Sequence, residues 1–135
     1  MYDLGRTGFG DGTNGIGIGA FGRDGIDNYR FDSLTVYNNT IVAKAGSAPN
    51  TGFRIANLST ASANAVTNIN VKNNIFSGFA GNWCELSYAN PITNINISYN
   101  DAYNNGNSNA IYIPNGTPTN YTHTNNITAN PTVVG

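Results

Sequence analysis

Polar and apolar residues alternate in a short phrase that recurs along this chain. The phrase begins with Thr-Asn, carries an apolar or ring-bearing residue at its third and fifth positions, and occupies residues 67–71, 93–97 and 119–123. These copies are 26 residues apart, and a looser copy at 32–36 begins 35 residues before the first. Alternation with a period of two predicts a β-strand with one face toward the core. A strand that returns at a fixed period of this length predicts a stacked, solenoid-like protein.

Each repeat adds further strand-like pieces to this phrase. The phrase itself places two columns of residues on the predicted inner face: Leu34, Ile69, Ile95 and Tyr121, and then Val36, Val71, Ile97 and His123. The second piece gives two more inner columns: Phe53, Cys84 and Ile111, and then Ile55, Leu86 and Ile113. A third apolar patch follows the phrase in each repeat: Ile41, Ile75, Ala102 and Ile127.

Three short strands in each rung of about 26 residues, joined by Asn- and Gly-rich corners, predict an all-β fold, a parallel β-helix of about four to five rungs. Helix is disfavoured because Pro, Gly, Asn and Thr are frequent and no window shows a 3.6-residue period. The rungs are expected to cover residues 31–135. Residues 1–30 are glycine-rich and are predicted to cap the solenoid or to form another rung, since residues 15–19 alternate Gly and Ile.

Asparagine dominates the composition with 25 of 135 residues, whereas glutamate occurs once. Stacked rungs place equivalent residues about 4.8 Å apart, where two like charges repel by roughly 0.9 kcal/mol even in water. Asn avoids that repulsion, hydrogen-bonds along a column and tolerates the left-handed backbone of tight corners. Every copy of the phrase leads to Asn at the same offset. We therefore predict a structural column of asparagines: Asn39, Asn74, Asn100 and Asn126.

Parts of these repeats resemble rungs of the right-handed parallel β-helix superfamily. That superfamily resembles pectate lyases and includes polygalacturonases, phage tailspikes and many surface proteins. The resemblance is carried by residues 34–41 (LTVYNNTI), 71–76 (VKNNIF), 97–103 (ISYNDAY) and 126–131 (NITANP). It covers about residues 31–135 and implies the right-handed β-helix fold. It does not imply one function, because a single fold carries many different sites.

Enzymes of that superfamily act mostly on acidic polysaccharides. Their lyases bind Ca²⁺ through Asp and Glu with an Arg or Lys base, and their hydrolases use paired Asp residues. Consecutive Asp residues, Gly-His-Gly and Arg-x-Lys are absent from this sequence. The acids in the well-defined rungs are Asp32, Glu85 and Asp101, and a glycosidase needs two carboxyl groups within about 5–10 Å. We therefore expect no catalytic residues, the alternative being a fragment of a polysaccharide lyase or glycoside hydrolase.

Arg54, Glu85 and Tyr112 share one outward column in the aligned rungs. One interpretation is a small polar site with Arg54 on an anionic sugar, and the alternative is a surface ion pair worth about 0–1 kcal/mol. Trp83 has small residues beside it in its own column, so its indole could stack on a sugar or pack beneath a corner loop. The candidate carbohydrate-binding residues are therefore Trp83, Tyr112, Arg54 and Glu85.

No metal site and no cofactor is predicted. Asp11, Asp24 and Asp27 lie in the glycine-rich segment, and Asp in such loops can hold Ca²⁺. Ordinary turns are favoured there, because neither EF-hand spacing nor the Gly-Gly-x-Gly-x-Asp nonapeptide occurs. His123 is the sole histidine, so it has no second His as a partner, and with Tyr121 it is expected to lie where the core ends.

Charge and cysteine content limit the possible partners. Charged residues make up 10% of the chain and the net charge is −1. Binding to nucleic acid or to an anionic membrane requires clustered Lys and Arg, so we expect neither as a partner. No apolar run approaches the about 20 residues needed to cross a membrane, so no membrane insertion is expected. Cys84 is alone, which excludes an internal disulfide, and the N-terminus lacks the apolar region of a signal peptide.

The ends of the predicted solenoid suggest its function. A β-helix exposes a full rung of unpaired N–H and C=O groups at each end unless something covers it. Residues 131–135 carry no amphipathic capping helix, so either the chain continues as a longer solenoid or neighbouring copies cover the ends. We predict a non-catalytic extracellular or cell-surface module that assembles as a homo-oligomer or end-to-end stack, with polysaccharide as a further contact.

Overall fold

The computed structural model describes residues 14–20, 30–43, 51–57, 65–88, 92–107 and 111–131. These residues form strands and turns and contain no helix. In chain order the strands are β1 Asn14–Ala20, β2 Arg30–Tyr37, β3 Thr40–Val42, β4 Thr51–Asn57, β5 Ala65–Lys72, β6 Ile75–Ser77, β7 Cys84–Tyr88, β8 Ile92–Ser98, β9 Asp101–Tyr103 and β10 Thr119–Thr124.

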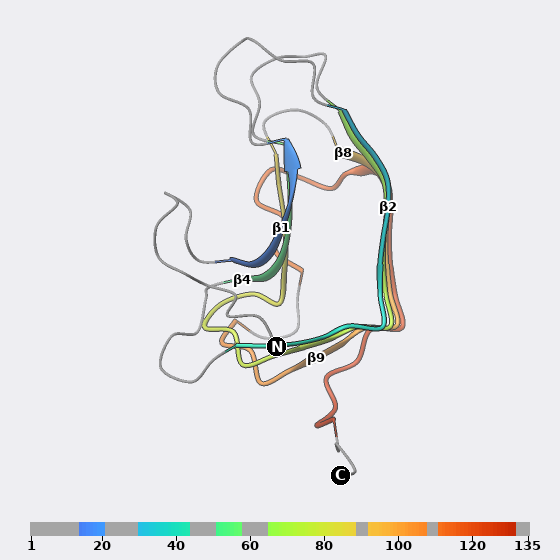
Figure 1. Cartoon of the computed structure of the whole chain (residues 1–135). Helices are drawn as coiled ribbons and strands as arrows, with labels where there is room; N and C mark the ends of the chain where they lie inside the picture. Colours follow the sequence, from blue (N-terminus) through green and yellow to red (C-terminus); the bar gives the residue numbers. More distant parts are fainter. Residues whose placement is uncertain are drawn as a thin grey trace.

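The strands form three parallel sheets. Sheet 1 has the order β1-β4-β7, sheet 2 the order β10-β8-β5-β2, and sheet 3 the order β3-β6-β9. From β1 to β9, consecutive strands belong to sheets 1, 2 and 3 in turn, so each circuit of three strands is one rung. In the last rung the isolated bridge of Tyr112 takes the place of a strand in sheet 1, and β10 follows in sheet 2. Figure 1 looks along the stacking direction: β2 and β8 overlap on the right, β1 and β4 lie on the left, and β9 lies below. The all-β prediction is confirmed, and this arrangement is consistent with a β-solenoid.

The two inner columns predicted from the recurring phrase are confirmed by the register of sheet 2. Ile95 pairs with Ile69 on one side and with Tyr121 on the other, and Ile69 pairs with Leu34. Ile69 and Ile95 are completely buried. The second column has the same register, from Val36 through Val71 and Ile97 to His123. Its two middle members, Val71 and Ile97, are also completely buried. The 26-residue repeat thus fixes which side chains stack in the core.

Sheet 1 follows the predicted register as well. Phe53 pairs with Cys84 and Ile55 with Leu86, and all four side chains are completely buried. Tyr112 forms an isolated parallel bridge with Glu85, which brings residues 111–113 alongside β7. On the other side, β1 pairs in register with β4, so residues 14–20 of the glycine-rich segment extend this sheet.

The prediction for the third apolar patch is wrong by one residue in two rungs. Phe76, not Ile75, pairs with Ile41 and Ala102, and these three side chains are buried. Ile75 pairs with Asp101 and lies on the outer column, and Ile127, also on that column, is 55% exposed. The reason lies at the corner: the preceding Asn74 points inward and is itself buried, so strict alternation sends the next residue outward.

The backbone explains much of the asparagine excess. Nine described residues other than glycine have a positive φ, between 54° and 63°, and seven of them are asparagines. Four precede the corner into sheet 3, namely Asn38, Asn73, Tyr99 and Asn125, and four bend the sheet 2 strands, namely Ser33, Asn68, Asn94 and Asn120. Most L-residues pay a steric cost in this left-handed region, whereas Asn enters it readily. The same bend therefore selects the same residue type in rung after rung.

Cys84 provides a natural probe of the packed core. Its side chain is completely buried, and burial raises the pKa of the thiol, with a further contribution from the negative charge of Glu85. The thiolate is the reactive form of cysteine, so the native thiol should be inert. We expect a soluble thiol reagent to modify Cys84 about 10³-fold or more slowly in native buffer than in denaturant. Labelling at the denatured rate in native buffer would show that sheet 1 is not packed as described.

Gly52 in β4 packs directly against the backbone of the next rung. A Cβ atom at this position would lie 2.8 Å from the carbonyl oxygen of Trp83 and 2.8 Å from the Phe79 ring. Because the Trp83 carbonyl accepts a hydrogen bond from the Phe53 N–H at 2.8 Å, it cannot move aside freely. We expect Gly52→Ala to lower the free energy of unfolding by about 1–3 kcal/mol, measured by urea denaturation. Thr35→Ala at an exposed strand position is the control, with an expected change within about 0.5 kcal/mol.

Candidate functional site

The outer face of sheet 1 brings together three of the four predicted carbohydrate-binding residues. Arg54 on β4 is paired in register with Glu85 on β7, and Glu85 is bridged to Tyr112. Their neighbours in sequence along β4 and β7 are buried, so alternation along each strand directs these side chains outward. The structure therefore places Arg54, Glu85 and Tyr112 in one column.

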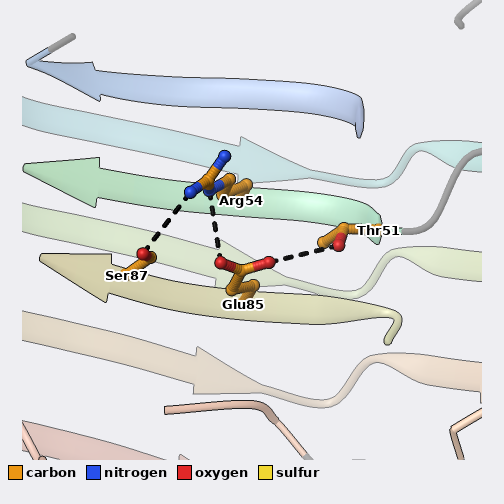
Figure 2. Close-up of polar contacts among 4 residues, drawn as sticks. All are labelled: Thr51, Arg54, Glu85 and Ser87. Carbon is orange, nitrogen blue, oxygen red and sulfur yellow. Dashed lines mark hydrogen bonds and ion pairs between the residues drawn. The ribbon is translucent and has the colours of Figure 1, made fainter. Parts of the chain in front are cut away.

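Arg54 and Glu85 form a half-buried ion pair (Figure 2). Arg54 Nε lies 3.3 Å from Glu85 Oε1, and the two side chains are 15% and 16% exposed. Two hydroxyl groups extend the cluster: Thr51 Oγ1 donates a hydrogen bond to Glu85 Oε2 at 3.3 Å, and Arg54 Nη2 donates one to Ser87 Oγ at 3.4 Å. Each charged group thus has an opposite charge and a hydroxyl group as neighbours.

A pocket of about 490 Å³ lies beside the Glu85 carboxylate. We call it the Glu85 pocket, and its lining residues are Thr51, Ala80, Gly81, Asn82, Glu85, Asn107 and Tyr112. Tyr112 is 49% exposed, so its ring is accessible from solvent. The lining combines one carboxylate, two amides, one hydroxyl group and an aromatic ring, which are groups that bind polyhydroxylated ligands by hydrogen bonding and stacking.

The loop after β6 and the loop after β9 form one wall of this pocket, and hydrogen bonds hold the two loops together. Asn105 Oδ1 accepts a bond from the Phe79 N–H at 3.0 Å, and the Gly106 N–H donates to the Phe79 carbonyl at 2.8 Å. The Asn107 N–H donates to the Gly81 carbonyl at 3.0 Å. A Cβ atom at position 106 would overlap the carbonyl oxygen of Ala80, so only glycine fits this approach. Sequence reasoning missed Asn82 and Asn107 because these residues lie on loops outside the repeated strands.

Trp83 does not join the pocket. Its indole is completely buried and packs against Phe76, with ring centroids 5.4 Å apart and an interplanar angle of 42°. Phe76 also packs against Phe53, so Trp83 belongs to an aromatic cluster inside the solenoid. The sequence left two interpretations open for Trp83, stacking on a sugar and packing beneath a loop, and its burial agrees with packing. The buried indole offers no face to a sugar, and we leave Trp83 out of the site.

The predicted asparagine column forms a continuous hydrogen-bonded ladder. At each step the backbone N–H and the side-chain Nδ2 of one Asn donate to the Oδ1 of the Asn in the next rung, at 2.8–3.0 Å. The steps run from Asn39 to Asn74, from Asn74 to Asn100, and from Asn100 to Asn126. Because a backbone N–H can only donate, the atom that it meets must be the amide oxygen. The ladder geometry thus fixes the orientation of each accepting amide.

The interior members of this ladder are buried and satisfied. Asn74 is 1% exposed and Asn100 is completely buried. Asn100 Nδ2 also donates to the carbonyls of Val71 and Ser98, at 3.0 and 3.1 Å, so one amide links three rungs. A buried polar group is costly unless its hydrogen bonds are made, and here they are. A second, exposed ladder follows the strands of sheet 2, from Asn120 to Asn94 to Asn68 and on to Asp32.

The described acidic residues are separated from one another. Asp32 lies on sheet 2, Glu85 on sheet 1 and Asp101 on sheet 3. Asp101 lines a second groove, of about 420 Å³, at the corner between sheets 2 and 3. Burial raises the pKa of the Asp101 carboxyl, whose Oδ1 is buried without a hydrogen-bond partner. No two of these carboxyl groups share a site in the part of the chain that the structure describes.

In the described ranges, side chains that could bind a metal ion do not gather into a cluster. No group of three or more His, Cys, Asp or Glu residues lies close enough there to hold a metal ion. Asp11, Asp24 and Asp27, the candidates for Ca²⁺, lie outside the described residues. His123 is exposed and stacks on Tyr121, with ring centroids 6.4 Å apart. A search of the described residues for a helix long and apolar enough to cross a membrane gives none.

The strands position the Arg54–Glu85 ion pair on the outer face, and the corners hold the asparagine ladder inside. The loops complete the Glu85 pocket.

Comparisons of this chain with protein-family models, with curated proteins and with solved structures find no match.

Proposed function

We propose that this chain is a non-catalytic structural module, a right-handed parallel β-helix of four rungs that assembles through its ends at a cell surface or outside the cell. Two observations support the β-helix. From β1 to β9 the chain passes through the three parallel sheets in the same order in each rung, and an asparagine ladder follows one corner. The hand follows the strong preference of parallel crossover connections for right-handed paths.

The gradient of burial along the stack carries the proposal of assembly. In sheet 2 the inner residues of the middle rungs are completely buried, whereas Leu34 and Val36 in the first rung are half-buried. In the last rung Tyr121 is half-buried and His123 is exposed. No described strand pairs with the outer edge of β10. An uncovered edge of this kind is a template for pairing with another chain.

The low charge of the module suits end-to-end contact. Only 10% of the residues are charged, and the inner columns at both ends carry none. Natural proteins commonly protect sheet edges with charged side chains, Lys above all. The described β10 residues are Thr119, Asn120, Tyr121, Thr122, His123 and Thr124, which include no Lys, Arg, Asp or Glu. The edge strand at the other end, β2, carries Arg30 and Asp32, whose opposite charges balance. Bringing this edge against β10 therefore incurs little net electrostatic cost.

Sedimentation velocity over a range of concentrations tests this assembly. We expect a mass that rises above 14.3 kDa with concentration. His123→Lys places a charge at the exposed end of an inner column and should abolish the association. Because His123 is exposed, the melting temperature measured at concentrations too low for assembly should stay almost unchanged. A mass of 14.3 kDa at every concentration would refute assembly through the ends.

The Glu85 pocket favours a second role, contact with a glycan. Its two amides, its hydroxyl group and the accessible Tyr112 ring can hydrogen-bond and stack with a sugar, while Arg54 neutralises the carboxylate. Oligosaccharide titration followed by calorimetry tests this role, and Tyr112→Ala should weaken binding about tenfold, by analogy with other ring contacts. Binding unchanged by Tyr112→Ala would remove this site from consideration.

The same preparation distinguishes a binding module from an enzyme fragment. A polysaccharide lyase would raise ultraviolet absorbance on pectin or alginate, and a glycoside hydrolase would release reducing ends. We expect neither signal, because the described carboxylates lie on three different sheets and Glu85 is paired with Arg54. Either signal, if lost in Glu85→Gln, would instead support the fragment of a lyase or hydrolase.

A further inference from the structure

The asparagine ladder has a direction. In every step the donors belong to the Asn of the earlier rung and the accepting Oδ1 to the Asn of the later rung. The Asn39 N–H and Nδ2 both donate to Asn74 Oδ1 at 3.0 Å, and the Asn100 pair donates to Asn126 at 2.8 and 2.9 Å. The ladder therefore ends in an acceptor at Asn39 and in a donor at Asn126.

Both ends of the ladder lack the partner that the interior members have. Among the described residues, no donor reaches Asn39 Oδ1, and the backbone N–H of Asn126 has no acceptor. Asn126 Nδ2 donates to the Ile97 carbonyl at 2.9 Å but lacks the acceptor amide that Asn74 and Asn100 each have in the next rung. Asn39 is exposed and Asn126 half-buried, in contrast to the two buried members between them.

We propose that the ladder continues from one copy of this chain into the next, head to tail, with Asn126 of one copy donating to Asn39 Oδ1 of a second copy. This inference rests on the assembly proposed above and names its partner and register. Strand β10 then pairs in parallel with β2 of the second copy. The repeat places Tyr121 opposite Leu34 and His123 opposite Val36, which are the positions already equivalent within one chain.

The alternative arrangement, tail to tail, does not satisfy the ladder. Wherever two ladders meet in that arrangement, the N–H of Asn126 faces the N–H of a second Asn126, so a donor meets a donor. Head-to-tail contact instead joins the donor end to the acceptor end and leaves one free end of each kind. A heterologous contact whose rotation does not close produces an open filament rather than a ring. The ladder polarity therefore selects a second copy in one orientation.

Engineered cysteines test this orientation. Thr35 and Thr122 are exposed and occupy the same outward column of sheet 2, which also holds Asn70 and Asn96. In a head-to-tail stack, position 122 of one copy lies one strand spacing, about 4.8 Å, from position 35 of the next. This spacing falls within the range of Cα separations that a disulfide bridges. The native Cys84 is buried and should not interfere.

The double variant Thr35→Cys, Thr122→Cys is oxidised with oxidised glutathione and analysed by non-reducing electrophoresis. We expect a series of covalent multimers at multiples of 14.3 kDa. Each single variant should give no more cross-linked species than the wild-type chain. The double variant Thr35→Cys, Asn96→Cys is the matched control, because its second thiol lies in the same column but inside the stack. It should remain monomeric on the gel.

The outcomes separate this inference from the assembly on which it rests. Efficient dimers of Thr122→Cys alone would indicate tail-to-tail contact, which overturns the head-to-tail inference but keeps assembly through the ends. Absence of multimers in the Thr35→Cys, Thr122→Cys variant, while sedimentation still gives large particles, would also overturn the register. Absence of multimers together with a mass of 14.3 kDa would overturn assembly itself.

Discussion

Ile95→Asp is expected to abolish folding of this chain. Ile95 is completely buried between Ile69 and Tyr121 in the central column of sheet 2. The substitution removes apolar contacts and places an ionised carboxylate where the neighbouring side chains are apolar. Such changes cost more than about 4 kcal/mol, which is comparable to the whole stability of a small domain. Circular dichroism should then show no cooperative thermal transition at pH 7.

Asn70→Asp, which introduces the same carboxylate on the outer face, is the control for Ile95→Asp. Asn70 is exposed on β5, immediately after Ile69, and its Oδ1 already accepts a bond from Asn96 Nδ2. Asn70→Asp keeps this acceptor, so its melting temperature should stay close to that of the wild-type chain. Cooperative melting of Ile95→Asp at the wild-type temperature would refute the register on which the inner columns depend.

Asn100→Asp is expected to destabilise the chain by an amount that grows with pH. The Asn100 Oδ1 accepts two hydrogen bonds, which a carboxylate oxygen also accepts, but its Nδ2 faces the carbonyls of Val71 and Ser98. An ionised carboxylate puts its second oxygen against those carbonyls, whereas a protonated one can still donate to one of them. The loss should be about 1–3 kcal/mol at pH 3 and larger at pH 8.

The sign of this pH dependence follows from proton binding. Burial and facing carbonyls raise the pKa of the introduced carboxyl in the folded state above its unfolded value of about 3.9. The folded variant therefore binds a proton more tightly than the unfolded chain, so its stability is greatest below the unfolded pKa. It falls as pH rises from there to the folded pKa. Chemical denaturation of variant and wild type at pH 3 and pH 8 measures the difference.

The exposed ladder provides the matched control for Asn100→Asp. Asn94 has the same residue type and also forms a rung-to-rung amide bond, but its side chain is exposed. Water can solvate the carboxylate there, so Asn94→Asp should show little pH dependence beyond that of the wild-type chain. Equal stability of Asn100→Asp at pH 3 and pH 8 would count against a buried column of stacked amides.

The repeat predicts the parts of the fold that depend on equivalence between rungs. Ile69, Ile95 and the members of the asparagine ladder lie where the 26-residue offset places them, since stacked parallel strands keep equivalent residues in register. The repeat does not determine which residue points inward at a corner. Counting apolar residues selected Ile75, but Asn74 occupies the inward position at the corner, so Phe76 is the next inward residue.

The candidate site was predictable only where it lies on strands. Arg54 and Glu85 were predicted to share a column from their offset alone, and they pair in register. Asn82 and Asn107 line the same pocket because their loops contact each other, and the period does not encode these contacts. Trp83 lies just before β7, and its burial depends on packing with Phe76 of sheet 3. Contacts between sheets follow from the shape of the corners, which the alternation pattern of a single strand does not specify.

Electron microscopy of the purified chain tests the central claim most directly. A head-to-tail stack adds four strands to sheet 2 for every copy, so the account predicts unbranched rods with an axial rise of about 19 Å per copy at a strand spacing of about 4.8 Å. His123→Lys should not form these rods. Dispersed particles one copy long, at concentrations where the wild-type chain is fully folded, would contradict assembly through the open ends.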